Sequence, residues 1–152
     1  PKLQPKKQGG AWGISNSLGH LAIGVNDGSV QVRKGIDPIS MLTTIAVLNH
    51  PKEWIEVIQY SPDDTMVAVG SHDNYIYIYE TEGYKLLNKC KGHNSYITSL
   101  DWNSSSEVIV SNCGAYELLF FDAKSGKMNP NGATAYKNEE YDTYTNKLGW
   151  HV

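Results

Sequence analysis

Cysteine is scarce in this 152-residue sequence, and long apolar runs are missing from it. The two cysteines, Cys90 and Cys113, are too few for a disulfide framework, so we expect free thiols in a reducing compartment. No stretch approaches the roughly 18 consecutive apolar residues of a membrane-spanning helix, and we expect no membrane partner. The sequence has no signal peptide and no initiating Met, which predicts a linker over residues 1–10 and a piece of a longer chain.

Positive charge is limited as well. The 13 Lys and Arg residues are outnumbered by 16 Asp and Glu residues, and the net charge is −3. Because broad nucleic-acid binding depends on a basic surface, we expect no nucleic-acid partner. A sustained helical period is also missing, so the chain is predicted to be all-β. Without a helix, no glycine-rich loop can hold a phosphate at a helix start, and we expect no cofactor.

Combinations of chemically active residues are few. Ser71, His72 and Asp73 are the residue types of a catalytic triad, but adjacent positions on one hairpin cannot converge as triad residues do. Turn formation is the interpretation that we favour for them, and we expect no catalytic residue and no enzyme.

A metal site has only a weak signal. Cys90 and His93 have the spacing of zinc ligands, but a structural zinc site needs a second pair of ligands. The fold would have to bring Cys113 to one of three histidines: His50, His72 or His93. We therefore expect no metal.

What the sequence does contain is a series of β-hairpins. The apolar runs Met66–Val69 and Tyr75–Tyr79 are rich in β-branched and aromatic residues, and the polar break 70–74 separates them. Comparable runs recur before and after this hairpin, at 11–16, 21–25, 30–33, 43–48, 54–60, 84–89, 96–102, 108–110 and 116–121. The sequence therefore predicts short antiparallel strands joined by turns.

The hairpins repeat with a fixed period. Trp54 and Tyr96 begin equivalent strands 42 positions apart, and Glu80 and Asp122 end equivalent strands at the same offset. Units of about 40–45 residues with four strands each are typical of β-propeller blades. We predict blades at 11–50, 51–92 and 93–135, and a loop with the first strand of a following blade at 136–152. About three and a half blades form an open arc, whose end faces the remaining blades of the propeller would cover.

Several of these residues resemble a WD repeat. Lys91-Gly92-His93 is similar to the opening of the repeat, and Phe120-Phe121-Asp122 to its Trp-Asp end. In that family a His, a turn Asp, a Ser or Thr and the Trp form a structural hydrogen-bond network. The resemblance assigns the network to His50, Ser71, Asp73, Tyr79, His93, Ser111, Phe121 and Asp122. Phe121 and Tyr79 depart from the Trp, and Ala115 leaves the third turn without its Asp.

The resemblance extends to the echinoderm microtubule-associated protein-like family. It is carried by residues 54–62 (WIEVIQYSP), 67–79 (VAVGSHDNYIYIY), 92–102 (GHNSYITSLDW), 111–122 (SNCGAYELLFFD) and 141–152 (YDTYTNKLGWHV), and more loosely by 21–32. The resemblance implies a place in the second, carboxy-terminal of two tandem propellers. It also implies a cytoskeletal protein that binds microtubules in the cytoplasm, the spindle or the axoneme of a cilium.

We therefore predict a non-catalytic scaffold that binds or stabilises microtubules or axonemal structure. Its expected partners are tubulin or microtubules and other axonemal or cytoskeletal proteins. The loops predicted to contact a partner contain Asn26, Asp27, His72, Asp73, Asn74, Gly114 and Ala115. The alternative is a generic WD-repeat adaptor in a soluble complex unrelated to tubulin.

Overall fold

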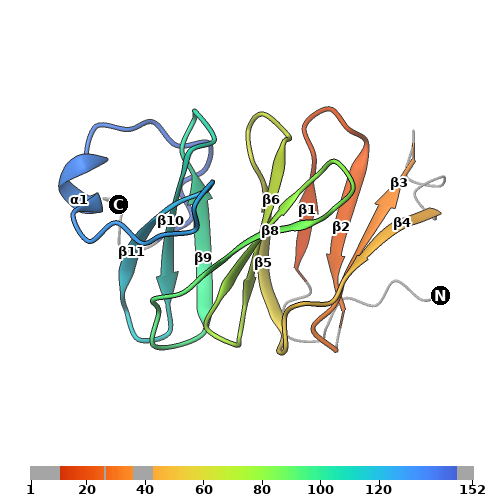
Figure 1. The fold of residues 1–152 in the computed structure, drawn as a ribbon, viewed down its shortest axis with the longest axis horizontal. Helices are drawn as coiled ribbons and strands as arrows, with labels where there is room; N and C mark the ends of the chain where they lie inside the picture. The colour runs from red at the N-terminus through yellow and green to blue at the C-terminus, as the bar shows by residue number, and fades with distance from the viewer. Residues whose placement is uncertain (1–10, 26, 36–42, 147–152) are drawn as a thin grey trace.

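Three antiparallel sheets stand side by side in the computed structural model, which describes residues 11–25, 27–35 and 43–146 (Figure 1). The first sheet contains β1 (Trp12–Ile14), β2 (His20–Gly24), β3 (Val30–Lys34) and β4 (Thr43–Leu48). The second contains β5 (Ile55–Tyr60), β6 (Met66–Ser71), β7 (Ile76–Glu80) and β8 (Leu86–Cys90). The third contains β9 (Ile97–Trp102), β10 (Val108–Cys113) and β11 (Leu118–Asp122).

The arrangement confirms the predicted all-β, partial propeller. Within each sheet the strands follow chain order, and the first strands β1, β5 and β9 adjoin one another. Separate meandering sheets that pack face to face around their first strands are the blades of a β-propeller. The described sheets form an open arc (Figure 1). No helix in the described part of the chain has the length and apolar character needed to cross a membrane.

Apolar side chains on both faces of the second sheet hold the arc together. Every residue of β6 is buried. Val67 and Val69 pack in a cluster that includes Val30 and Val32 of the first sheet. Side chains alternate along a strand, so Met66 and Ala68 point to the opposite face. They pack in the cluster that includes side chains of the third sheet. A strand buried on both faces accounts for the nearly continuous apolar run in the sequence.

The tyrosines of β7 belong to this packing. Tyr77 and Tyr79 are 2% and 0% exposed in the cluster between the first two sheets, and Tyr75 packs at its margin. Ile76 and Ile78 alternate with them and face the third sheet. The tyrosine-lined face is therefore part of the seam between blades.

The third sheet differs from the predicted four strands. In the described residues after β11 there is no further strand of this sheet, only two isolated bridges, Phe121 to Met128 and Asn103 to Tyr141. The chain then folds back through the one-turn helix α1 (Gly132–Ala135). A Cβ at Gly132 would lie 2.4 Å from Phe120, so only glycine allows this close approach. The returning segment covers the outer face of the sheet, where Tyr141 and the ring of Phe120 are buried.

A buried carboxylate fastens the C-terminal segment to β9. Asp101 is 0% exposed, and its Oδ1 accepts hydrogen bonds from the hydroxyls of Thr143 (2.6 Å) and Thr145 (2.7 Å). Its Oδ2 accepts from the side-chain amide of Asn146 at 2.6 Å. Hydrogen bonds to an ionised acceptor are stronger than neutral ones, which offsets the cost of burying the charge. The predicted strand of a following blade lies partly at 147–152, outside the described residues.

The seam between the second and third sheets gives a stability prediction. Trp102 is fully buried, and its indole nitrogen donates to the carbonyl of Gln59 at 3.0 Å. Trp102→Phe removes buried volume and leaves that carbonyl unpaired, so we expect a loss of about 2–3 kcal/mol in the free energy of unfolding. Urea unfolding measures it. Trp12→Phe, at a side chain 47% exposed, is the matched control and should change stability by less than about 0.5 kcal/mol. Equal losses in both variants would contradict the seam interpretation.

Candidate functional site

The hairpin turns predicted to contact a partner lie along one edge of the arc, the lower edge in Figure 1. They are the β2–β3, β6–β7 and β10–β11 turns, one from each sheet, and we call this side the turn edge. Asp27 is exposed, and its Oδ1 accepts from the backbone nitrogen of Ser29 at 2.9 Å. Asn26 lies outside the described residues.

Asp73 organises the second turn from within. Its Oδ2 accepts from the Tyr77 hydroxyl (2.6 Å) and the Lys52 backbone nitrogen (2.9 Å). Burial raises the pKa of Tyr77, and the hydrogen bond to Asp73 raises it further, so the phenol stays protonated and donates. Asn74 completes the turn at φ 77°. The carboxylate of Asp73 is thus occupied internally, although the turn itself is partly exposed.

His72 connects the second sheet to the third through an aromatic stack. Its ring lies 4.6 Å from that of Tyr96, at an interplanar angle of 16°, and 5.1 Å from that of Trp54. Its Nε2 lies 3.4 Å from the Glu56 carboxylate. Tyr96 remains 40% exposed. The stack therefore presents an aromatic surface at the turn edge where two blades meet.

Among the described residues, the third turn carries the most exposed aromatic side chain. Tyr116 is 83% exposed and has a left-handed φ of 61°. A Cβ at Gly114 would lie 2.5 Å from the Tyr96 ring, so the turn approaches that ring closely because residue 114 has no side chain. Ala115 is exposed beside it. A pocket of about 460 Å³ is lined by Tyr96, Thr98, Ser99, Asn112, Cys113, Gly114, Tyr116 and Thr145.

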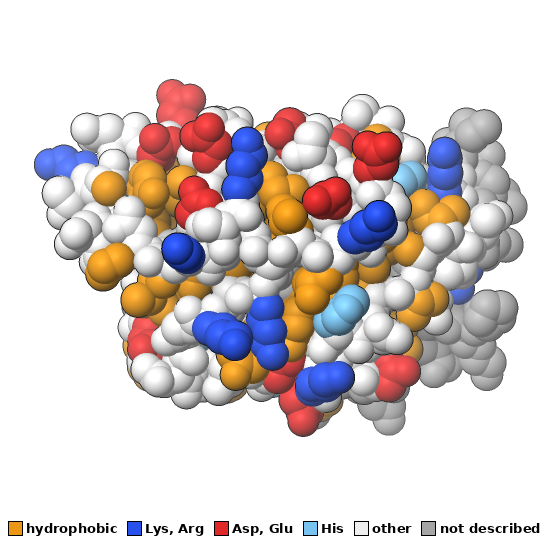
Figure 2. All heavy atoms as spheres, in the orientation of Figure 1, with side chains coloured by type: hydrophobic (Ala, Val, Ile, Leu, Met, Phe, Trp, Pro, Cys, Tyr) orange, Lys and Arg blue, Asp and Glu red, His pale blue; other side chains and the backbone are white. Residues whose placement is uncertain are grey.

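Both signs of charge appear on the visible face. Many acidic side chains lie toward the upper edge in Figure 2, and the lower half carries several Lys or Arg side chains together with further acidic ones. Lys52 and Lys91 are exposed in the connections that lead into β5 and β9, and Glu53 is exposed next to Lys52. The turn edge therefore combines exposed aromatic rings with charged groups of both signs.

The third sheet brings His93 and Ser111 together. His93 Nε2 lies 2.7 Å from the Ser111 hydroxyl, and the His93 ring lies 6.0 Å from that of Phe121. Asp122 is separate from this pair, and its Oδ1 accepts from the Ser125 backbone nitrogen at 2.8 Å in the turn after β11.

In the second sheet the His and Ser assigned to the network bond to other partners and not to each other. His50 Nδ1 bonds the Tyr79 hydroxyl at 3.0 Å, whereas Ser71 donates to the Glu53 carbonyl at 3.2 Å. Strand register explains the difference: Ser71 pairs with Ile55 in β5, as Cys113 pairs with Ile97 in β9. Ser71 is therefore the counterpart of Cys113, and the counterpart of Ser111 is Val69, which has no hydroxyl.

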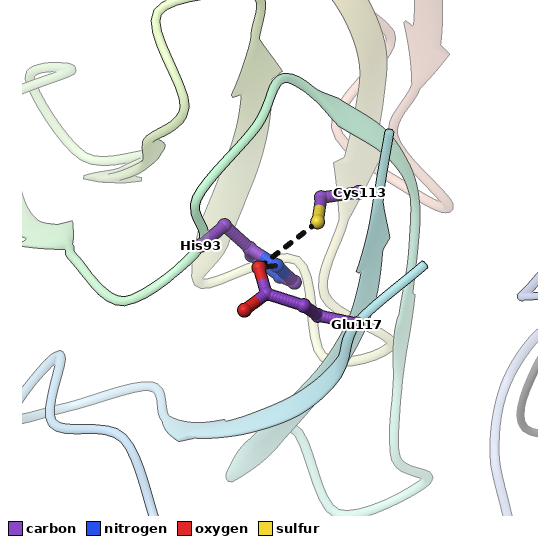
Figure 3. Close-up of side chains that lie close together, drawn as sticks. All are labelled: His93, Cys113 and Glu117. Atoms are coloured by element: carbon purple, nitrogen blue, oxygen red, sulfur yellow. Dashed lines mark hydrogen bonds and ion pairs between the residues drawn. The ribbon is translucent and has the colours of Figure 1, made fainter. Parts of the chain in front are cut away.

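Glu117 is the residue that the sequence analysis missed. Ala115 leaves the turn without an Asp, but Glu117 reaches back so that its Oε1 lies 3.5 Å from His93 Nδ1 (Figure 3). The same oxygen accepts from the Asn94 backbone nitrogen (2.8 Å) and lies 3.1 Å from the Cys113 sulfur. An acidic residue two positions after the expected one was the available signal.

The pKa values of Glu117 and His93 are both lowered in the folded protein, the first by hydrogen bonds and the second by burial. The hydrogen bond from the Asn94 backbone, followed by that from Cys113, lowers the pKa of Glu117 to about 2. Burial lowers the pKa of His93. At neutral pH the folded state therefore holds a carboxylate beside a neutral imidazole.

These shifts predict how the protein responds to acid. The pKa of Glu117 falls from 4.5 to about 2 on folding, so its stabilisation is complete above pH 4.5 and lost as the pH falls toward 2. We expect Glu117→Gln to unfold at lower urea concentration at pH 7 and to lose less stability across this window than the wild type. Urea titrations at several pH values measure both effects. Glu82→Gln, at an exposed carboxylate, is the control, and a Glu117→Gln profile parallel to wild type would contradict the assignment.

Comparison with known proteins places this geometry in a family. Residues 2–152 match the family described as the echinoderm microtubule-associated protein second beta-propeller. The chain is 48% identical over 134 residues to the ciliary WD repeat-containing protein ctxp80 of Euplotoides octocarinatus, covering 88% of this chain and 18% of that protein. It is 43% identical over 112 residues to the 77 kDa echinoderm microtubule-associated protein of Strongylocentrotus purpuratus, covering 71% and 16%.

A solved structure supports the fold independently. The crystal structure of the computationally designed Ika4 protein superposes with a TM-score of 0.67 at 20% identity, covering 82% of this chain and 72% of that one. The chain spans less than a fifth of the two natural relatives, and the match lies within one propeller. The chain therefore belongs to the echinoderm microtubule-associated protein family, as part of its second β-propeller.

Proposed function

We propose that this chain is a non-catalytic binding module that attaches its parent protein to microtubules or to axonemal proteins through the turn edge. The observation that carries the proposal is the line of turns with exposed aromatic rings, Tyr96 and Tyr116, beside exposed lysines. The relatives support the class of partner, because one is named as a ciliary protein and another as a microtubule-associated protein. The cytoskeleton, including that of the cilium, is the corresponding location.

The fold suits a module that binds without rearranging. Close-packed apolar seams join the second sheet to both neighbours, so the turns that these sheets support are held in fixed relative positions. Pre-positioned loops lose little conformational entropy on binding. A repeated lattice would then be recognised by the sum of several modest contacts rather than by one deep pocket.

The triad residue types do not converge, which supports the non-catalytic reading. The Ser71 hydroxyl donates to the Glu53 carbonyl, and the Asp73 carboxylate is occupied by Lys52 and Tyr77. His72 stacks on Tyr96 instead of activating a hydroxyl. A nucleophile must lie within hydrogen-bond reach of its base, whereas here Ser71 and Asp73 are engaged in other hydrogen bonds and His72 in a ring stack.

Microtubule co-sedimentation of the full-length parent tests the proposal. We expect Tyr116→Ser to weaken binding about tenfold, since exposed tyrosines often act as interface anchors and tenfold corresponds to about 1.4 kcal/mol. Val47→Ser, at an exposed apolar residue of the outer strand β4, is the matched control and should bind as wild type.

The outcomes separate the proposal from its alternative. A wild-type parent that stays in the supernatant at physiological salt would leave the WD-repeat adaptor unrelated to tubulin as the better account. Binding that is lost in Val47→Ser but kept in Tyr116→Ser would move the contact from the turn edge to the outer strand.

A further inference from the structure

We propose that His93, Cys113 and Glu117 form a binding site for a divalent cation of the zinc class. The three side chains come from the connection before β9, the end of β10 and the turn between β10 and β11, and they converge in Figure 3. One ligand atom from each, a nitrogen, a sulfur and an oxygen, lies within 4.8 Å of the other two. Nitrogen, thiolate and carboxylate ligands together are the donor set that Zn²⁺ prefers. This proposal departs from the expectation of no metal, which considered only pairs of Cys and His and did not include Glu117.

The distances are close to those around a bound ion. With metal–ligand bonds of about 2.0–2.3 Å and tetrahedral angles, two ligand atoms stand about 3.4–3.6 Å apart. The Glu117 oxygen lies 3.5 Å from His93 Nδ1 and 3.1 Å from the Cys113 sulfur. Small side-chain rotations, without movement of the strands, would bring all three atoms to one ion.

His93 directs its Nδ1 toward Glu117 without forming a hydrogen bond. The side chain is 1% exposed, and the buried Nδ1 lies 3.5 Å from the Glu117 carboxylate, with no hydrogen-bond partner among the described residues. An unpaired buried polar atom costs free energy, and a bound cation would remove that cost. The other ring nitrogen, Nε2, is held by the Ser111 hydroxyl at 2.7 Å. In the tautomer in which Nε2–H donates to Ser111, this bond fixes the ring and presents the Nδ1 lone pair to a metal ion.

Glu117 supplies both an oriented ligand and an entry path. The backbone and side-chain nitrogens of Asn94 donate to its two carboxylate oxygens, at 2.8 and 2.7 Å. Its side chain is 26% exposed, so an ion can reach the otherwise buried group from solvent. On binding, the Cys113 S–H bond breaks, its proton goes to solvent, and the sulfur electron pair forms the metal–sulfur bond. Thiolate and carboxylate then balance the two charges of the cation, with a neutral imidazole as third ligand.

The second sheet lacks these ligands. The strand registers place Ser71 where the third sheet has Cys113, and Tyr75 occupies the position that corresponds to Glu117. Neither is a good zinc ligand. Packing requirements shared by the sheets therefore do not account for the Cys and Glu at these positions.

Titration of the reduced, metal-free 152-residue chain with Co²⁺ and Zn²⁺ tests the proposal. Co²⁺ is the probe because a thiolate ligand gives an intense charge-transfer absorption, which we expect to saturate at one equivalent and to be displaced by Zn²⁺. Cys113→Ser should abolish this absorption, and Glu117→Gln should weaken Zn²⁺ binding at least about tenfold by removing a charged ligand. Zn²⁺ should raise the Tm of the wild type and not that of Cys113→Ser, because only the former binds it in the folded state.

Cys90 provides a matched control. Cys90 is also buried, but it ends β8 and packs among the apolar side chains between the second and third sheets, so Cys90→Ser should keep the absorption. Circular dichroism of each metal-free variant establishes that it is folded. The proposal is overturned if a folded wild type shows no thiolate absorption at one equivalent, or if the absorption survives in Cys113→Ser. In either case the three side chains form a hydrogen-bonded cluster only.

Discussion

Burial of apolar side chains in the seams between neighbouring sheets is the constraint on which the rest of the structure depends. Alternate residues of β6 pack into different seams, so Val69 belongs to the seam with the first sheet and Ala68 to the seam with the third. Each fully buried aliphatic side chain contributes about 1.5–3 kcal/mol relative to an exposed one. The seams therefore fix the relative position of the sheets, and through them the line of turns at one edge.

Most of the architecture could be predicted from the sequence because the repeat is local. A hairpin such as 66–80 shows its strands in β-branched and aromatic residues and its turn in Gly70 to Asn74, and the same pattern returns 42 positions later. The missing fourth strand of the third sheet was not predictable in this way. The segment after Met128 covers the outer face of its own sheet instead, through Gly132 and Tyr141, and such long-range packing leaves no periodic signal.

The candidate site was less accessible to sequence reasoning. The pairing of His93 with Ser111 follows from the WD-repeat resemblance, but the register that aligns Ser71 with Cys113 appears only once the strands are paired. The sequence did not indicate Glu117, because its longer side chain reaches the histidine from a position two residues beyond the expected Asp. Side chains at the turns thus divide between internal hydrogen bonding, as for Asp73, and exposure, as for Tyr116.

The central functional claim is that rigid seams present the turn edge to a cytoskeletal partner. Hydrogen–deuterium exchange of the full-length parent, with and without microtubules, tests it most directly because it locates contacts on the folded protein. The account predicts that exchange slows on binding in the β6–β7 and β10–β11 turns, at residues 72–74 and 114–117, while the opposite edge at 62–65 and 104–107 is unchanged. Protection confined to the opposite edge would contradict it.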